Sequence, residues 1–196
     1  MISRNKPASN KDVVIGVDCG MEGGIVALDI FSKVLVDWFP MPLVTYYEGL
    51  PHVSPVDVIS LSYSLEQMFI SYIAVEVPRS IPNLNKASNI FRQGCNVQAV
   101  IDCCLLLGLE RKLILLNERE WQPESNTKKG KDSYLEWIPT DTKKAFTRKR
   151  CRVPHKGAVD AYLMAKYTLE TSNKLEYYRD RKEVKKKPKL KKNWKF

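Results

Sequence analysis

The chain of 196 residues is 44% hydrophobic, which suits one domain with a buried core. No apolar run is long enough to span a membrane, and the polar N-terminus lacks a signal-peptide stretch, so we expect an intracellular, cytoplasmic protein that is not secreted. The formal net charge is +10, but residues 179–196 hold ten Lys or Arg against two acidic residues. That segment therefore carries +8 and leaves only +2 for residues 1–178.

The five cysteines are an odd number without a CxxC spacing, so they indicate neither a zinc site nor a disulfide framework. We expect most of them to be small core residues in a reducing compartment. Cys103 and Cys104 lie in an apolar helical run, which predicts burial. Cys19 would be a nucleophile only with a His nearby, so we expect it to be a core residue as well.

After a flexible arm at residues 1–11, the first strong signal is a hairpin. Val13–Val17 reads as a buried strand that ends in Asp18, and a glycine-rich turn leads to a second apolar run, Ile25–Ile30. Residues 33–39 alternate well enough to form a third strand. The N-terminal part of the sheet is therefore predicted to be a three-stranded antiparallel meander.

A helix and a strand follow the meander. Ser54 and Pro55 predict an N-cap and a first helical position, and apolar residues at helical spacing continue to Met68. Ser71–Pro78 reads as a strand that carries Glu76 near its end. A helix before this strand favours a parallel pairing with the first strand, which would bring Asp18 and Glu76 to the same edge of the sheet.

The second half of the chain predicts one more strand, at 112–116, between helices. The long helix at 87–109 should place six apolar residues on its inner face: Ile90, Val97, Val100, Ile101, Leu105 and Leu106. Residues 123–139 are polar and read as an exposed loop. A short helix is expected at 141–146.

The last predicted helix, Gly157–Tyr167, carries Asp160 in its first turn. Three of its apolar residues are expected to face the core: Leu163, Met164 and Tyr167. We place the folded domain at residues 12–172. Residues 173–196 are predicted to be a basic, disordered tail, because the composition at the end of the chain is too charged to fold alone.

Three acidic residues thus sit on core elements: Asp18, Glu76 and Asp160. A buried carboxylate is unfavourable unless something compensates its charge, and three together would repel one another without cations. Oxygen ligands suit Mg²⁺ or Mn²⁺, and two such ions about 4 Å apart can promote phosphodiester hydrolysis. The alternative for Asp18 is a turn residue that bonds to its own loop amides.

The order of these motifs is similar to that of a known family. The strand followed by Asp18-x-Gly-x-x-Gly-Gly24, then Ala74-Val-Glu76, then His155-x-Gly-x-x-Asp-Ala-x-Leu-x-Ala165 resembles RuvC-type Holliday-junction resolvases, particularly phage-borne members. The middle of the chain agrees with the same pattern through Pro82, Ser88, Phe91, Gly94 and Trp121. The resemblance covers residues 13–167. It implies a ribonuclease H-like α/β fold, in which a mixed five-stranded sheet of an antiparallel meander plus parallel strands is flanked by helices.

The resemblance further implies a homodimeric endonuclease of viral or bacterial origin that nicks branched DNA in recombination and repair, with two Mg²⁺ ions, or Mn²⁺ in their place, at each site. Asp18, Glu76 and Asp160 would be catalytic metal ligands. The family usually has a fourth acidic residue, or a His, three to five positions before the last Asp, and this chain has no acid there. His155 is the candidate replacement as ligand or base, with an ordinary loop histidine as the alternative. Lys156 is a candidate for neutralising the scissile phosphate.

Contacts to DNA are expected from two regions besides the tail. The start of the long helix offers Lys86, Phe91, Arg92 and Gln93, with Phe91 in the position of an aromatic that wedges into the branch point. The basic run before the last helix offers Lys143, Lys144, Arg148, Lys149, Arg150 and Arg152. The tail would add salt-sensitive affinity for phosphates or act as a localisation signal.

Three other functions compete with junction resolution. Half of an actin-like or sugar-kinase ATPase also contains an Asp-x-Gly hairpin, but this chain is too short for two lobes and has no second phosphate loop. A catalytically silent module could bind branched DNA without cutting it. A related nuclease could act on other replication intermediates or on RNA–DNA hybrids, because substrate shape is read by loops and dimer geometry.

Overall fold

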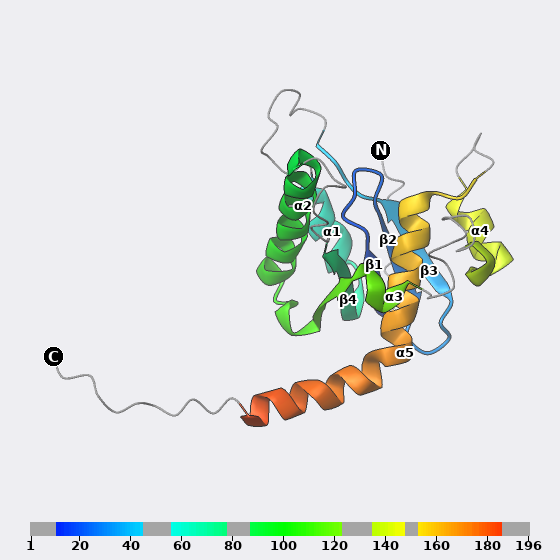
Figure 1. Ribbon diagram of the computed structural model, residues 1–196. Coiled ribbons are helices and arrows are strands. Elements are labelled where there is room, and N and C mark those ends of the chain that lie inside the picture. The colour runs from blue at the N-terminus through cyan, green and yellow to red at the C-terminus, as the bar shows by residue number, and fades with distance from the viewer. Residues whose placement is uncertain (1–10, 45–55, 78–86, 123–134, 148–152, 186–196) are drawn as a thin grey trace.

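The computed structural model describes residues 11–44, 56–77, 87–122, 135–147 and 153–185 (Figure 1). Predictions for residues 1–10, the loop at 123–134, the basic run at 148–152 and the end of the tail lie outside this part. The elements in chain order are β1 (Asp12–Val17), β2 (Gly24–Asp29), β3 (Leu35–Pro40), α1 (Val58–Glu66), β4 (Phe69–Val77), α2 (Ala87–Leu106), the 3₁₀ helix η1 (Glu110–Lys112), β5 (Leu113–Asn117), α3 (Glu118–Trp121), α4 (Thr140–Phe146) and α5 (Lys156–Lys185).

The five strands form one mixed sheet in the order β3-β2-β1-β4-β5. β1 and β3 pair antiparallel with β2, as the predicted meander requires. β4 pairs parallel with β1, with Val75 opposite Val17. β5 in turn pairs parallel with β4. The predicted sheet class and the parallel pairing of the fourth strand are therefore confirmed.

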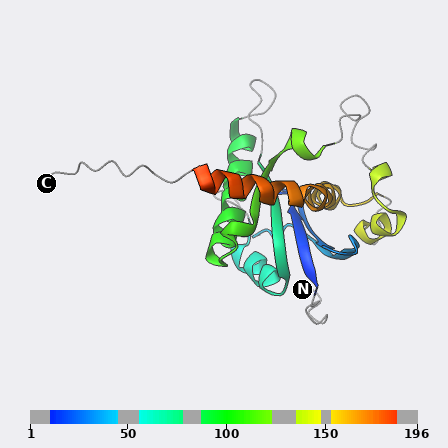
Figure 2. The same cartoon turned by 90° about the horizontal axis from the view of Figure 1, so that it is seen from below.

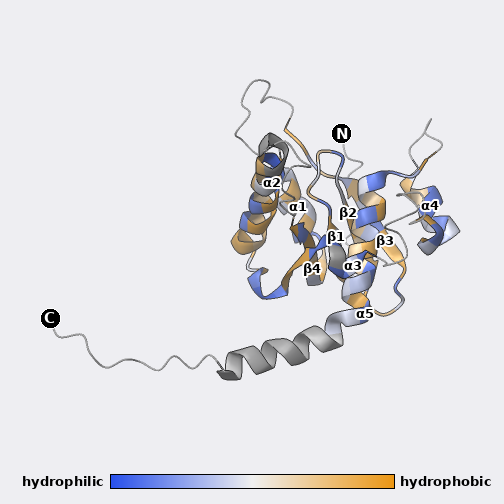
Figure 3. Ribbon diagram, viewed as in Figure 1, coloured by the Kyte–Doolittle hydropathy of each residue, from blue (hydrophilic) through white to orange (hydrophobic). Residues whose placement is uncertain are grey.

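Helices cover both faces of this sheet, because its central strands are apolar on both sides. One core contains Ile15 and Val17 of β1 packed with Leu61 of α1 and Val100 of α2. The other core lies between the opposite face and α5, and it also takes in α3 and α4. Figure 2 shows the sheet between α1 and α2 on one side and α5 on the other. Figure 3 shows that α2 carries both hydrophobic and hydrophilic residues, as a helix on a protein surface does.

Two predicted helix features are wrong. α1 begins at Val58 and not at Pro55, because the Asp57 side chain caps it by accepting the Ser60 backbone N–H at 3.1 Å. The inner face of α2 does not include Leu105 or Leu106, whose side chains are 51% and 79% exposed. The buried positions at this end of α2 are Cys103 and Cys104, as predicted for these two cysteines.

The last helix is longer than its sequence pattern indicates. Leu163 and Met164 are buried and Tyr167 packs against the same core, as expected. α5 then continues to Lys185, so residues 173–185 are helical where a disordered segment is predicted. The boundary of the domain at residue 172 stays a prediction. Among the described residues, no helix is both long enough and apolar enough to cross a membrane.

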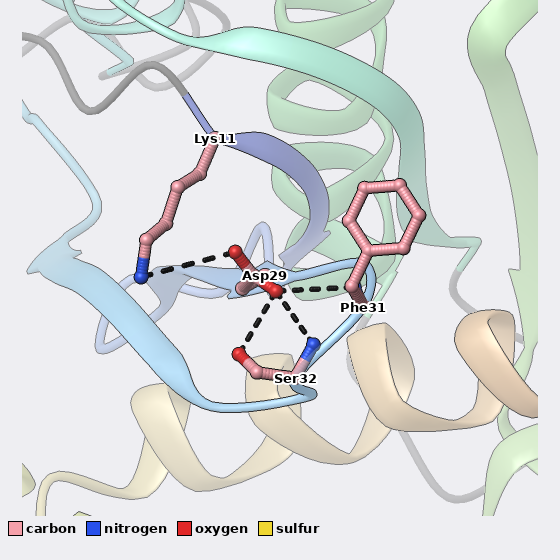
Figure 4. A network of polar contacts seen from close by, with 4 residues as sticks. All are labelled: Lys11, Asp29, Phe31 and Ser32. Carbon is pink, nitrogen blue, oxygen red and sulfur yellow. Dashed lines mark hydrogen bonds and ion pairs between the residues drawn. The ribbon is translucent and has the colours of Figure 1, made fainter.

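A polar network organises the turn between β2 and β3 (Figure 4). Asp29 is 6% exposed, and its Oδ1 accepts the backbone N–H groups of Phe31 and Ser32, at 3.1 and 2.6 Å, together with the Ser32 hydroxyl at 2.8 Å. Lys11 Nζ lies 3.9 Å from Asp29 Oδ2. The Ser32 bonds, followed by the weaker effects of Phe31 and Lys11, hold the pKa of the Asp29 carboxyl below its usual value. The carboxylate form thus stabilises this turn.

Candidate functional site

Asp18 directly follows β1, and Glu76 lies near the end of β4, the parallel strand beside β1. Val17 pairs with Val75 at the carboxyl ends of these strands. Asp18 follows Val17 in the sequence and Glu76 follows Val75, so the two carboxylates are neighbours at this edge. Val17, Cys19 and Val75 all belong to the core on the α1–α2 side. Since side chains alternate along a strand, Asp18 and Glu76 belong to the opposite side, which α5 covers.

The third carboxylate enters this layer from α5. Gly157 forms a parallel β-bridge with Gly23, which ties the first turn of α5 to the β1–β2 turn. A Cβ atom on Gly24 would lie 2.8 Å from the Ala158 nitrogen, so the two backbones can approach this closely only without a side chain. Asp160, one turn further along α5, is 8% exposed. The structure therefore brings Asp18, Glu76 and Asp160 to one end and one face of the sheet.

Electrostatics support the proximity of the first two carboxylates. Cys19 is 3% exposed, and the pKa of its thiol is raised well above the usual value, first by burial and then by the negative charges of Asp18 and Glu76. Both charges thus act on the same buried atom. A thiol held in its protonated form is a poor nucleophile, which argues against a catalytic role for Cys19.

The turn after β1 is held by several hydrogen bonds. The Asp18 Oδ1 atom accepts the Gly20 backbone N–H at 2.8 Å, which is the bond expected of a turn aspartate. The Asp18 N–H donates to the Gly24 carbonyl at 3.0 Å, and the Gly23 N–H donates to the Gly20 carbonyl at 2.8 Å. The backbone beside the carboxylate is therefore well ordered by its own bonds.

The three carboxylates do not form a ready-made metal site. Within the described ranges, no group of three His, Cys, Asp or Glu side chains is placed to hold one metal ion. The donor set nevertheless has the chemistry that Mg²⁺ and Mn²⁺ prefer, since all three side chains supply carboxylate oxygens. A shared Mg²⁺ would require these oxygens to converge to about 2.1 Å from one point.

His155 occupies the N-cap position of α5. Its Nδ1 atom accepts the Ala158 backbone N–H at 3.3 Å, and its carbonyl accepts the N–H groups of Ala158 and Val159 at 3.1 Å. Its ring lies 5.5 Å from the Trp38 ring, and Trp38 Nε1 donates to the Ala145 carbonyl at 2.9 Å. An acceptor at Nδ1 requires the tautomer with the proton on Nε2, so a metal or a base role would compete with this tautomer.

The candidate DNA contacts are exposed at the start of α2 and of α5. Phe91 is 52% exposed, and Arg92, Gln93 and Lys156 are exposed as well. Lys143 is half-buried, and Lys144 is exposed with its Nζ 3.9 Å from Asp141. Five further candidates lie outside the described residues: Lys86, Arg148, Lys149, Arg150 and Arg152.

The sequence reasoning missed one residue beside this site. Asn96 of α2 is 1% exposed, and its Nδ2 atom donates a hydrogen bond to the Cys19 carbonyl at 2.9 Å. Asn96 lies four residues before Val100 and seven before Cys103, so helical periodicity alone places it on the buried face. A buried amide on that face needs a hydrogen-bond partner, so an Asn at this helical position could have been recognised from the sequence as a residue with a specific contact.

Comparison with known proteins supports the architecture. The chain matches no protein-family model and no curated protein sequence. Among solved structures, it is similar to RuvC of T. thermophilus in complex with a Holliday junction substrate, with a TM-score of 0.53 and 14% identity over 83% of this chain and 95% of that one. That similarity together with the mixed five-stranded sheet shows that this chain has the ribonuclease H-like fold.

Proposed function

We propose that this protein is a metal-dependent endonuclease that hydrolyses phosphodiester bonds in branched DNA and resolves Holliday junctions by paired nicks as a homodimer. The observation that carries the proposal is the gathering of Asp18, Glu76 and Asp160 from β1, β4 and α5 at one end and one face of the sheet. The similar RuvC structure contains a Holliday junction, which supports branched DNA as the substrate class. An intracellular location belongs to the same proposal.

In this proposal, Asp18, Glu76 and Asp160 hold Mg²⁺, with Mn²⁺ as a substitute. The bound metal would lower the pKa of a water molecule and stabilise the charge of the phosphodiester transition state. Asp18 is held at the end of β1 by its bond from Gly20, and Asp160 is held by the packing of α5. The His155 Nε2 atom is the candidate for orienting water. Lys156, in the first turn of α5, would bind the scissile phosphate together with the positive end of the helix.

The exposed residues at the start of α2 would position the branch point. Arg92 and Gln93 can donate hydrogen bonds to phosphates, and the exposed ring of Phe91 can stack on a base next to the branch. Because α2 also reaches the Asp18 turn through Asn96, one helix links the DNA contacts to a candidate catalytic carboxylate.

The most informative test compares cleavage of a four-way junction, a flap, a linear duplex and an RNA–DNA hybrid at one salt concentration, with Mg²⁺ and with Mn²⁺. We expect paired nicks in the junction and much slower cutting of the linear duplex. Preferred cutting of the flap or the hybrid would assign the protein to other replication intermediates. Absence of cutting on every substrate with both metals would refute the nuclease.

The second candidate is a module that binds branched DNA without chemistry. It is favoured by the lack, within the described ranges, of three side chains placed to hold one metal ion, and by the lack of an acidic residue just before Asp160. This module would bind a four-way junction more tightly than a linear duplex. Adding a divalent metal would leave its affinity unchanged and would not lead to cleavage of the DNA. A gel-shift titration run beside the cleavage assay separates the two functions.

A further inference from the structure

Asn96 is a polar side chain in an otherwise apolar contact between α2 and the sheet. It is 1% exposed, and its neighbours on the same helix, Val97 and Val100, belong to the core beneath β1. Burying an amide is unfavourable unless its groups find hydrogen-bond partners. The Nδ2 atom of Asn96 finds one in the Cys19 carbonyl, at 2.9 Å.

The bond from Asn96 acts on the peptide group that holds Asp18. The carbonyl of Cys19 and the N–H of Gly20 belong to one planar peptide unit. Asn96 donates to the Cys19 oxygen of this unit, and the Gly20 N–H of the same unit donates to Asp18 Oδ1 at 2.8 Å. Because the plane is rigid, fixing the oxygen also fixes the direction in which the N–H meets the carboxylate.

We propose that Asn96 is a positioning residue, which sets the orientation of the Asp18 carboxylate through the Cys19–Gly20 peptide plane. The inference rests on the proposed function insofar as Asp18 acts as a metal ligand. Asn96 touches neither the substrate nor the metal in this scheme. Its loss therefore impairs the placement of Asp18 more than it impairs DNA binding.

The first experiment measures positioning without catalysis. Asn96→Leu replaces the amide by an apolar group of similar size, and Val100→Ala removes apolar volume from the same helix and core without touching the peptide plane. NMR hydrogen exchange of the Gly20 amide is measured in both variants and compared with the loss of global stability in each. In Asn96→Leu, this amide should exchange at least about 10-fold faster than the variant's loss of global stability accounts for. In Val100→Ala, the Gly20 amide should follow the global stability. Equal behaviour in the two variants overturns the proposal.

The second experiment measures the consequence for the site. For Asn96→Leu, the Mn²⁺ concentration that gives half-maximal junction cleavage should rise by about 10-fold or more, as for other residues that orient a metal ligand. The affinity for the junction without metal should stay within about 2-fold of the wild type. The inference is contradicted if the half-maximal Mn²⁺ concentration of Asn96→Leu is no higher than that of Val100→Ala. If Asn96→Leu does not fold, Asn96→Ala removes the same donor without a branched side chain.

The two experiments fail separately. If the wild type does not cleave DNA, the proposed function falls, while the exchange of Gly20 still decides whether Asn96 orients Asp18. If the wild type cleaves and the Gly20 amide is unaffected by Asn96→Leu, the nuclease stands and the positioning role is refuted.

Discussion

Gly16 on β1 packs directly against the carbonyl group of Ala161 on α5. A Cβ atom at Gly16 would overlap that carbonyl and would also lie 2.9 Å from the Ala165 nitrogen. These are backbone atoms of a helix, so they cannot move aside as the end of a flexible side chain could. Since Asp160 immediately precedes Ala161, the missing side chain at Gly16 sets how closely this carboxylate approaches the ends of the strands.

Gly16→Ala should therefore destabilise the protein by about 1–3 kcal/mol or more, because α5 would have to move away from β1. Urea denaturation followed by circular dichroism measures this change. Gly94→Ala is the matched control, since no atom outside the neighbouring helix backbone lies within 4 Å of the position of its new Cβ. In the exposed interior of α2, that change should stabilise the protein by about 0.5–1 kcal/mol. Equal effects at the two glycines would refute the close contact.

Asp18→Asn and Asp160→Asn should each reduce junction cleavage by more than about 100-fold, because the loss of a ligand exceeds the effect of its supporting residues. Both variants should still bind a four-way junction in a gel-shift assay. Asp141→Asn serves as the control, because its side chain is fully exposed on α4. Cleavage at the wild-type rate by either variant would remove that residue from the catalytic set.

His155 permits a test that separates a cap from a catalytic group. His155→Ala should cost about 1 kcal/mol in urea denaturation, and His155→Asn should cost much less, because Asn is a good N-cap. If His155 acts only as the cap, His155→Asn should cut junctions as the wild type does. If Nε2 also orients water, both variants should cut about 100-fold more slowly or worse. Equal stability of all three proteins would refute the cap.

Asp29 predicts a pH dependence of stability. The pKa of its carboxyl is lower in the folded chain than in the unfolded chain, so the carboxylate stabilises the fold above pH about 4. Asp29→Asn should therefore lower the urea midpoint at pH 7. The difference from the wild type should shrink as the pH falls below about 4, where the wild-type carboxylate takes up its proton.

Urea midpoints measured between pH 2.5 and pH 7 (about the titration range of a carboxyl group) provide the test. Asp141→Asn is the control, and its urea midpoint should stay close to that of the wild type because this side chain is fully exposed. A stability difference at Asp29 that is constant with pH would contradict the role of its charge.

Local patterns in the sequence determined much of the fold. The short apolar runs that lead to Asp18 and Glu76 predicted two strands that end in carboxylates, and the intervening helix predicted their parallel pairing. Such patterns succeed because strand and helix periods are set by neighbouring residues. The same reasoning was wrong for Leu105 and Leu106, because the direction in which the end of α2 faces depends on where the helix meets the sheet.

Only the tertiary structure decided how the site is supported. The bond from Asn96 to Cys19, the bridge between Gly23 and Gly157, and the contact of His155 with Trp38 all join residues that are far apart in the sequence. Periodicity reports which face of an element is buried, but it does not report which partner lies opposite. The sequence by itself therefore named the three carboxylates, whereas the fold decided which residues hold them in place.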